Sequence, residues 1–127
     1  MNIKSISPHD QSVIGDTPIS SAEEIESAVK KAREALIGWK STPIEERCKY
    51  VTKFGEELKE NGEELAKLIS MEMGKPLTQA RDDVNSELAF IKYYAGNGPK
   101  FLADEKVWGD EKNNFRMTYE PYGVVAC

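Results

Sequence analysis

The stretch from residue 20 to residue 98 contains four successive helix signals, which constrain the fold more than any other feature. The first begins with a capping box formed by Ser21 and Glu24, three residues apart. The apolar residues that follow recur every three or four positions, as one helix face requires: Ile25, Val29, Ala32 and Leu36. This pattern predicts an amphipathic helix that ends near Gly38.

The second signal is a cap, a first-turn proline and a capping-box acid at Thr42, Pro43 and Glu45. The predicted helix runs to about Asn61-Gly62. Its predicted buried stripe is Ile44, Cys48, Val51, Phe54 and Leu58. Because a buried cysteine behaves as a small hydrophobe, Cys48 is expected to pack in the core.

Two further helices complete this segment. The third has an apolar stripe of Leu65, Leu68 and Ile69. It is predicted to stop at Gly74, with Pro76 just beyond. The fourth is predicted to begin at a Thr78 cap and to end at Gly96-Asn97-Gly98-Pro99. Its predicted buried face is Ala80, Val84, Leu88 and Ile91.

Residues 1–19 have the character of a β arm. Short apolar pairs at Val13-Ile14 and Pro18-Ile19 are separated by Gly15-Asp16. Glycine followed by aspartate is typical of a turn, so a strand pair with its turn at Gly15-Asp16 is expected.

The hydrophobic period changes to two within residues 104–121. Phe115, Met117 and Tyr119 alternate with polar residues, and Lys106–Trp108 offers a partner across a polar loop. A β-hairpin is therefore predicted. Residues 122–127 then include a fully apolar run, typical of a strand buried on both faces. Because the sequence ends inside that run, a truncation is expected.

Charge and composition exclude several classes of partner. The net charge is −5, and Lys and Arg are interspersed with acids, so nucleic acid is not an expected partner. No apolar run approaches the ~20 residues that span a bilayer, and the N-terminus lacks the apolar core of a signal peptide. A cytoplasmic location with reduced thiols at Cys48 and Cys127 is expected.

The residues by themselves indicate no catalytic group and no cofactor-binding group. The glycines include no dinucleotide or phosphate-loop motif, since Gly96-Asn97-Gly98 is followed by Pro99. His9 is the single histidine, beside Asp10 in a polar stretch, and a solvated loop residue is its simplest interpretation. The pattern alone does not name a function.

Short motifs in a fixed order nevertheless resemble a known family. Met71–Pro76 is similar to the E-x-G-K-P motif of aldehyde dehydrogenases. The other landmarks of that family have counterparts in Ser7-Pro8, Val13–Gly15, Trp39, Glu46-Arg47, Tyr93–Gly96 and Glu120–Val125. His9–Gln11 departs from the usual opening of the family. The chain resembles the N-terminal portion of an aldehyde dehydrogenase over essentially its whole length, and Lys100–Glu105 is most similar to the succinate-semialdehyde branch.

This resemblance implies an α/β parent fold, of which the present segment is mostly α-helical: about four helices, an N-terminal strand pair and a C-terminal β-hairpin. Members of the family oxidise aldehydes to carboxylic acids through a cysteine thiohemiacetal, with hydride transfer to NAD or NADP. The family's nucleotide-contacting motif, nucleophile and base all lie beyond the matched region. Cys127 does not match the nucleophile motif, so the chain alone is expected to be inactive and to bind no cofactor.

The resemblance also implies partners. Residues 104–121 would belong to the oligomerisation region and residues 122–127 to the first strand of the nucleotide domain. The expected partners are the remainder of the dehydrogenase and neighbouring subunits, and the chain is a homo-oligomer or aggregation-prone alone. Some members hold a monovalent cation, here at the Glu72 carboxylate and the Ile6 carbonyl. An acid satisfied by solvent remains the alternative for Glu72.

Two functions are therefore compared. The first is a scaffold and assembly segment of an NAD(P)-dependent aldehyde dehydrogenase. The second is a stand-alone helical interaction module that docks onto a full-length relative through the Phe115–Tyr119 edge. An apolar C-terminal run favours the first, because an independent module should end in a polar or capped segment.

Overall fold

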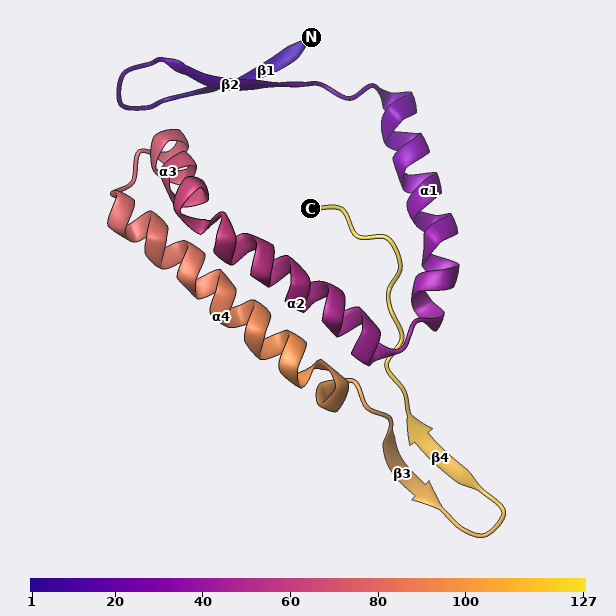
Figure 1. Cartoon of the computed structure of the whole chain (residues 1–127). Coiled ribbons are helices and arrows are strands. Elements are labelled where there is room, and N and C mark those ends of the chain that lie inside the picture. Colours follow the sequence, from indigo (N-terminus) through magenta and orange to yellow (C-terminus); the bar gives the residue numbers. More distant parts are fainter.

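A computed structural model describes residues 1–127 as four helices between two small antiparallel sheets (Figure 1). The elements in chain order are β1 (Asn2–Ile6), β2 (Val13–Pro18), α1 (Ala22–Ser41), α2 (Ile44–Glu60), α3 (Gly62–Met73), α4 (Leu77–Phe101), β3 (Glu105–Gly109) and β4 (Asn114–Met117). The mostly helical segment with a strand pair at each end is as predicted.

The N-terminal hairpin forms, but its turn lies elsewhere than predicted. Gly15 and Asp16 lie inside β2, opposite β1, so the turn expected there is wrong. The chain reverses over residues 8–10 instead. The Asp10 carboxylate accepts hydrogen bonds from the Ser12 hydroxyl at 2.7 Å and the Ser12 amide at 3.1 Å, which stabilise the reversal. These bonds lower the pKa of Asp10 to about 2.

The start of α1 is as predicted, and its end is not. The Ser21 amide donates to the Glu24 carboxylate at 2.7 Å, and the Glu24 amide donates to the Ser21 hydroxyl at 3.2 Å, which completes the capping box. The helix continues past Gly38, whose carbonyl accepts a hydrogen bond from the Thr42 hydroxyl at 3.1 Å. Thr42 thus closes α1 and does not cap α2, which begins after Pro43 without a side-chain cap.

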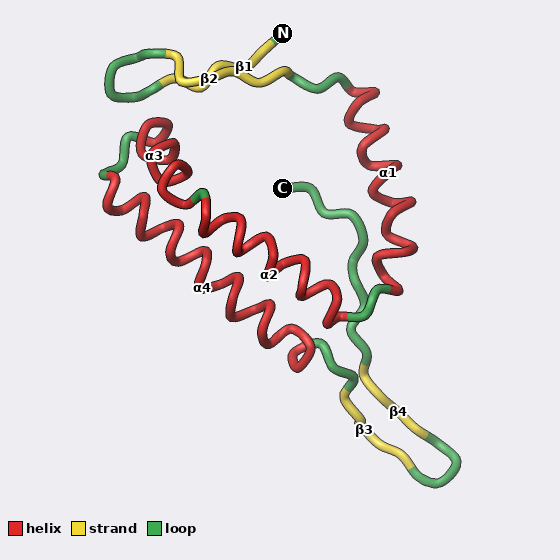
Figure 2. The backbone as a smooth tube through the Cα atoms, viewed as in Figure 1, coloured by secondary structure: helices red, strands yellow, loops and turns green.

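Helices α2 and α4 pack side by side and antiparallel, with α3 against the start of α4 (Figure 2). Glycines make the close approach possible. A Cβ at Gly55 would lie 2.8 Å from Ile91 Cγ2, and one at Gly98 would lie 2.7 Å from Cys48 Sγ. The small core beside this crossing contains buried Ala66, Ala80 and Val84, flanked by Leu65, Ile69, Leu77 and Leu88.

The buried stripe predicted for α2 is only partly correct. Cys48 is half-buried against α4, but Val51 and Phe54 remain 42% and 61% exposed. The reason is that α4 contacts the neighbouring face of α2, where Gly55 allows a closer approach than large side chains would.

Helix α4 is longer at both ends than the sequence indicates. It begins at Leu77 after Pro76, so Thr78 is not its cap, and it passes through Gly96–Pro99 to Phe101. The predicted stop is therefore wrong, although Pro99 removes one backbone donor from the last turn. The predicted buried face is confirmed for Ala80 and Val84, while Leu88 and Ile91 are half-buried. Gly74 ends α3 at φ 70°, as predicted.

The C-terminal hairpin pairs Glu105 with Met117 and Trp108 with Phe115. The two aromatic rings of the second pair lie 5.4 Å apart. Residues 118–127 are not a strand here, which differs from the expectation for Val124–Cys127. An extended segment becomes a strand only when another strand satisfies its backbone groups, and this segment lies along α1 instead (Figure 1).

Few side chains are removed from solvent. Six of the 127 residues are buried, and none of them belongs to α1. Large apolar side chains are exposed on every helix, among them Ile37, Phe54, Met73 and Phe90. No helix combines the length and apolar character needed to cross a membrane.

Candidate functional site

The segment Met71–Pro76 is a structural joint between the N-terminal hairpin and the α3–α4 corner. Gly74 lies so close to the hairpin turn that a Cβ there would be 2.8 Å from Pro8 Cγ. The Lys75 ammonium forms an ion pair with Asp83 on α4. The Ser70 hydroxyl donates to the Lys75 carbonyl at 2.8 Å. The motif that carried the resemblance therefore positions three elements and presents no reactive group.

Glu72, one of the two predicted cation ligands, lies at this joint. The Ser5 hydroxyl, from the strand that also carries Ile6, donates to Glu72 Oε1 at 2.6 Å. Ser5, Asp16 and Glu72 line one groove, and no cluster of three or more His, Cys, Asp or Glu side chains is present. The cation site remains a prediction.

The residues with possible covalent or acid–base chemistry are on separate elements. Cys48 lies in α2 against Gly98, and Cys127 is exposed in the terminal segment. His9 lies in the turn of the N-terminal hairpin. That the chain holds no catalytic and no cofactor-binding residue stays a prediction.

Charged side chains connect neighbouring elements at the surface. The Arg81 guanidinium donates to both Glu63 oxygens at 2.6 and 2.8 Å, which ties α4 to α3. Those hydrogen bonds lower the pKa of Glu63 and raise that of Arg81. On the hairpin, the Tyr119 hydroxyl donates to Glu105 at 2.6 Å, which raises the pKa of Tyr119. Such exposed pairs orient elements but stabilise them weakly.

The remaining feature is an apolar groove on α1. On α1, a shallow groove formed with the terminal segment is lined by Ala32, Ala35, Leu36, Trp39, Gly123, Val124 and Val125. An ion pair between Lys40 and Glu120 holds the same segment to α1. None of the side chains that line this groove carries an ionisable or nucleophilic group.

Sequence reasoning missed the second face of α2. Gly55 and Thr52 lie beside the large apolar residues and line the groove toward α4. The glycine inside α2 was the available signal, because a residue without a Cβ allows a close approach of the backbone.

Comparisons with known proteins agree with this architecture. The family model described as "Aldehyde dehydrogenase family" matches residues 1–127. The chain belongs to the aldehyde dehydrogenase family. The predicted family and fold are thereby confirmed.

Individual aldehyde dehydrogenases also match the chain. The chain is 31% identical over 123 residues to a succinate semialdehyde dehydrogenase [NAD(P)+] of Escherichia coli, covering 97% of this chain and 26% of that protein. A malonate-semialdehyde dehydrogenase of Geobacillus kaustophilus is 36% identical over 90% of the chain and 24% of its own length. The chain thus spans about a quarter of the length of the curated relatives that it matches.

Among solved structures, a betaine aldehyde dehydrogenase of Staphylococcus aureus in complex with NAD⁺ superposes with a TM-score of 0.86 at 27% identity. That match covers 95% of this chain and 25% of the enzyme. A glyceraldehyde-3-phosphate dehydrogenase of Methanocaldococcus jannaschii complexed with NADP gives 0.78 at 31% identity, over 85% of this chain and 24% of that chain. An enzyme solved with NAD⁺ and one solved with NADP therefore share this helical scaffold.

Proposed function

We propose that this chain is the N-terminal scaffold and assembly segment of an NAD(P)-dependent aldehyde dehydrogenase, which converts an aldehyde to a carboxylic acid. One observation carries the proposal: the family match extends over residues 1–127 yet spans about a quarter of each relative. The exposed apolar side chains support it, because a domain that works alone covers most of its large hydrophobic residues.

The proposed partners are the remaining part of the dehydrogenase and neighbouring subunits. Residues 104–121 would join the oligomerisation region, since β4 leaves an open edge for another strand. Residues 122–127 would become the first strand of the nucleotide domain once a strand pairs with them. NAD or NADP would be held by that domain and by no residue of this chain.

Succinate semialdehyde is the proposed substrate of the assembled enzyme. Support comes from the Escherichia coli relative of that name and from Lys100–Glu105. Relatives named for malonate and aspartate semialdehydes match about equally well, so these aldehydes are the proper competitors in an assay. A cytoplasmic location is part of the same proposal.

Complementation tests the proposal. The chain is co-expressed with the part of the Escherichia coli enzyme that it does not match, which is about three quarters of that protein. We expect NAD(P)⁺ reduction with succinate semialdehyde only when both pieces are present, because the nucleophile and base belong to the larger piece. Each piece alone is the control, and turnover by this chain alone would contradict the proposal.

A cation bound by the Ile6 carbonyl and the Glu72 carboxylate is proposed to hold the N-terminal hairpin against α3. If it binds, potassium or sodium chloride should raise the melting temperature above that in choline chloride at equal ionic strength. Glu72→Gln should abolish the difference, whereas Asp16→Asn in the same groove should preserve it. An equal melting temperature in all three salts would leave Glu72 as an acid bonded only to Ser5 and solvent.

A further inference from the structure

The chain contains two Asn-Gly dipeptides, Asn61-Gly62 and Asn97-Gly98, which lie in different local structures. Both asparagine side chains make the same contact, since each Nδ2 donates to the backbone carbonyl four residues earlier at 2.8 Å. An asparagine side chain reacts most readily with the following backbone nitrogen when that residue is glycine, because no Cβ hinders ring closure. The two sites therefore differ in their surroundings and not in their intrinsic chemistry.

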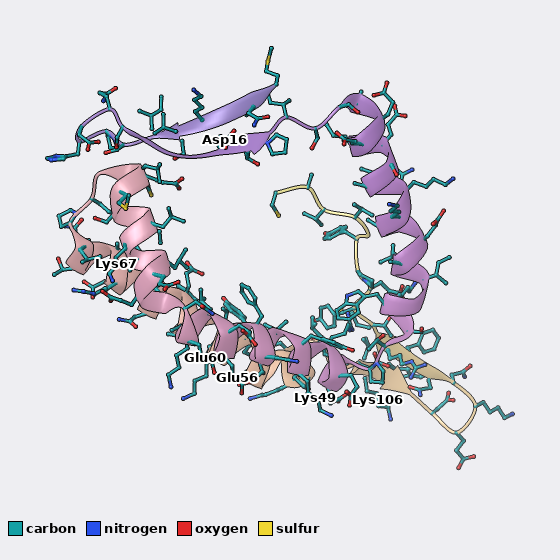
Figure 3. All side chains as sticks on the ribbon, turned by 45° about the horizontal axis from the view of Figure 1, so that its top comes forward. Asp16, Lys49, Glu56, Glu60, Lys67 and Lys106 are labelled. Carbon is teal, nitrogen blue, oxygen red and sulfur yellow. The ribbon has the colours of Figure 1, made fainter.

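Asn61 is the single residue between α2 and α3, and the ribbon changes direction at this joint, between Glu60 and Lys67 (Figure 3). Its side chain is exposed, and its backbone, at φ −99° and ψ 8°, departs from regular helical values. Gly62 is the first residue of α3, so its amide has no acceptor within that helix. The reacting groups at this site are thus held by no continuous run of helical hydrogen bonds.

Asn97 lies inside α4, which continues to Phe101, and is half-buried. Each amide in a helix interior donates to the carbonyl four residues earlier, so the amide of Gly98 is engaged. Gly98 also lies against α2, where a Cβ would be 2.7 Å from Cys48 Sγ. Ring closure at Asn97 requires the end of α4 to unfold and leave α2, whereas ring closure at Asn61 requires movement of the joint alone.

We propose that Asn61-Gly62 is a site of spontaneous deamidation in the folded chain and that Asn97-Gly98 is protected. The Gly62 nitrogen attacks Asn61 Cγ, the bond from Cγ to Nδ2 breaks, and ammonia leaves with the proton of the Gly62 amide. Water then opens the resulting succinimide at either of its two carbonyls, which gives aspartate or isoaspartate at position 61. The reaction consumes water and needs no oxidant, reductant or cofactor.

The modification changes the joint between α2 and α3. Asn61 Nδ2 donates to the Glu57 carbonyl near the end of α2, and an ionised carboxylate has no proton to donate there. Isoaspartate also inserts the side-chain methylene into the main chain. Because Gly62 packs on α4, where a Cβ would lie 3.3 Å from Val84 Cγ1, a longer main chain displaces this contact. Deamidation should therefore loosen the joint and add a negative charge.

Peptide mapping by mass spectrometry measures both sites in one sample of the full chain, incubated at mildly alkaline pH and body temperature. Trypsin releases the sites in separate peptides, residues 60–67 and 93–100, and a sample digested without incubation corrects for reaction during digestion. We expect Asn61 to convert about tenfold or more faster than Asn97, because the joint opens more readily than a packed helix. In concentrated urea the two rates should become similar.

Equal or reversed rates in the folded chain would overturn the proposal. An Asn61 peptide that stays unmodified in the folded chain but converts in urea would do the same, because the joint would then be protected as well. Isoaspartate in the Asn61 peptide distinguishes ring closure from direct hydrolysis of the side chain, which gives aspartate alone. Aspartate without isoaspartate would rule out the cyclic route.

Gly62→Ala is the matched variant, because it keeps Asn61 and adds the Cβ that hinders ring closure. It should slow conversion of Asn61 about tenfold and leave conversion of Asn97 unchanged. Circular dichroism checks that the helices persist, and if they do not, the urea comparison and the isoaspartate content of the unaltered chain decide.

The deamidated chain is more acidic and can be separated from the unmodified chain by anion exchange. Hydrogen exchange should then be faster in the last turn of α2 and the first turn of α3 of the deamidated form, and unchanged in α1. Identical exchange in the two forms would show that the modification does not loosen the joint.

Discussion

Helix α1 and the α2–α4 pair have equally clear helical patterns but very different packing. Both contain apolar stripes, and α1 has the better cap. Yet α2 and α4 contact each other closely through Gly55 and Gly98, whereas α1 has no buried residue. It contacts the terminal segment and, at its C-terminal end, Tyr50 of α2, whose ring lies 5.7 Å from that of Trp39. Figure 2 shows this separation of α1 from the other helices. Helix formation is thus local, while burial depends on what is available to pack against.

The largest expected difference between these regions is the free energy of unfolding lost when a leucine is replaced by alanine. Leu88 packs on the core of α3 and α4, so Leu88→Ala should lower the free energy of unfolding by about 2 kcal/mol, the low end for a leucine that is only half-buried. Leu36→Ala on α1 should cost less than about 1 kcal/mol, because Leu36 lines a shallow groove and belongs to no buried core. Urea denaturation followed by circular dichroism compares them, and equal losses would show that α1 is packed as firmly as α4.

The same glycine substitution should have opposite signs in the two regions. Gly55→Ala places a Cβ 2.8 Å from Ile91 and should destabilise the chain by about 1 kcal/mol. Gly38→Ala meets no atom within 4 Å and should stabilise α1 by about 0.5–1 kcal/mol through its higher helix propensity. Thermal unfolding of both variants measures the signs. A stabilising Gly55→Ala would mean that α2 and α4 are not in close contact.

Removal of the capping box should affect α1 alone. Ser21→Ala leaves the Glu24 amide without its acceptor and should cost about 1 kcal/mol. Hydrogen exchange should become faster in the first turn of α1 and stay unchanged in α2 and α4, because α1 shares little contact with them. Faster exchange throughout the chain would show that the helices unfold as one cooperative unit.

The smallest effect is expected from the ion pair between α3 and α4. The Arg81 hydrogen bonds lower the pKa of Glu63 below its ordinary value of 4.5. Stability from this pair is therefore present above that value and is lost as the pH falls through the lower folded pKa. Glu63→Gln should remove this component from a plot of unfolding free energy against pH, and Glu64→Gln serves as the control. An unchanged plot would show that the exposed pair contributes nothing.

Much of the local structure could be predicted from the sequence. The capping box at Ser21, the left-handed stop at Gly74 and the buried positions of Ala80 and Val84 are where the pattern placed them. These features depend on residues within a few positions of each other, so short-range rules suffice. The resemblance likewise identified the family, and it directed attention to Glu72, which contacts the N-terminal hairpin.

The tertiary structure decided which helix faces are packed and which stay exposed. Val51 and Phe54 have the spacing of a core stripe, but α4 packs where Gly55 permits a closer approach, so the larger side chains remain free. Likewise, the hairpin turn lies at residues 8–10, where Asp10 accepts from Ser12, and α4 continues to Phe101 despite Gly96 and Pro99. Sequence period reveals that a face is apolar; only the neighbouring elements determine what covers it, because burial is a property of two surfaces and not of one.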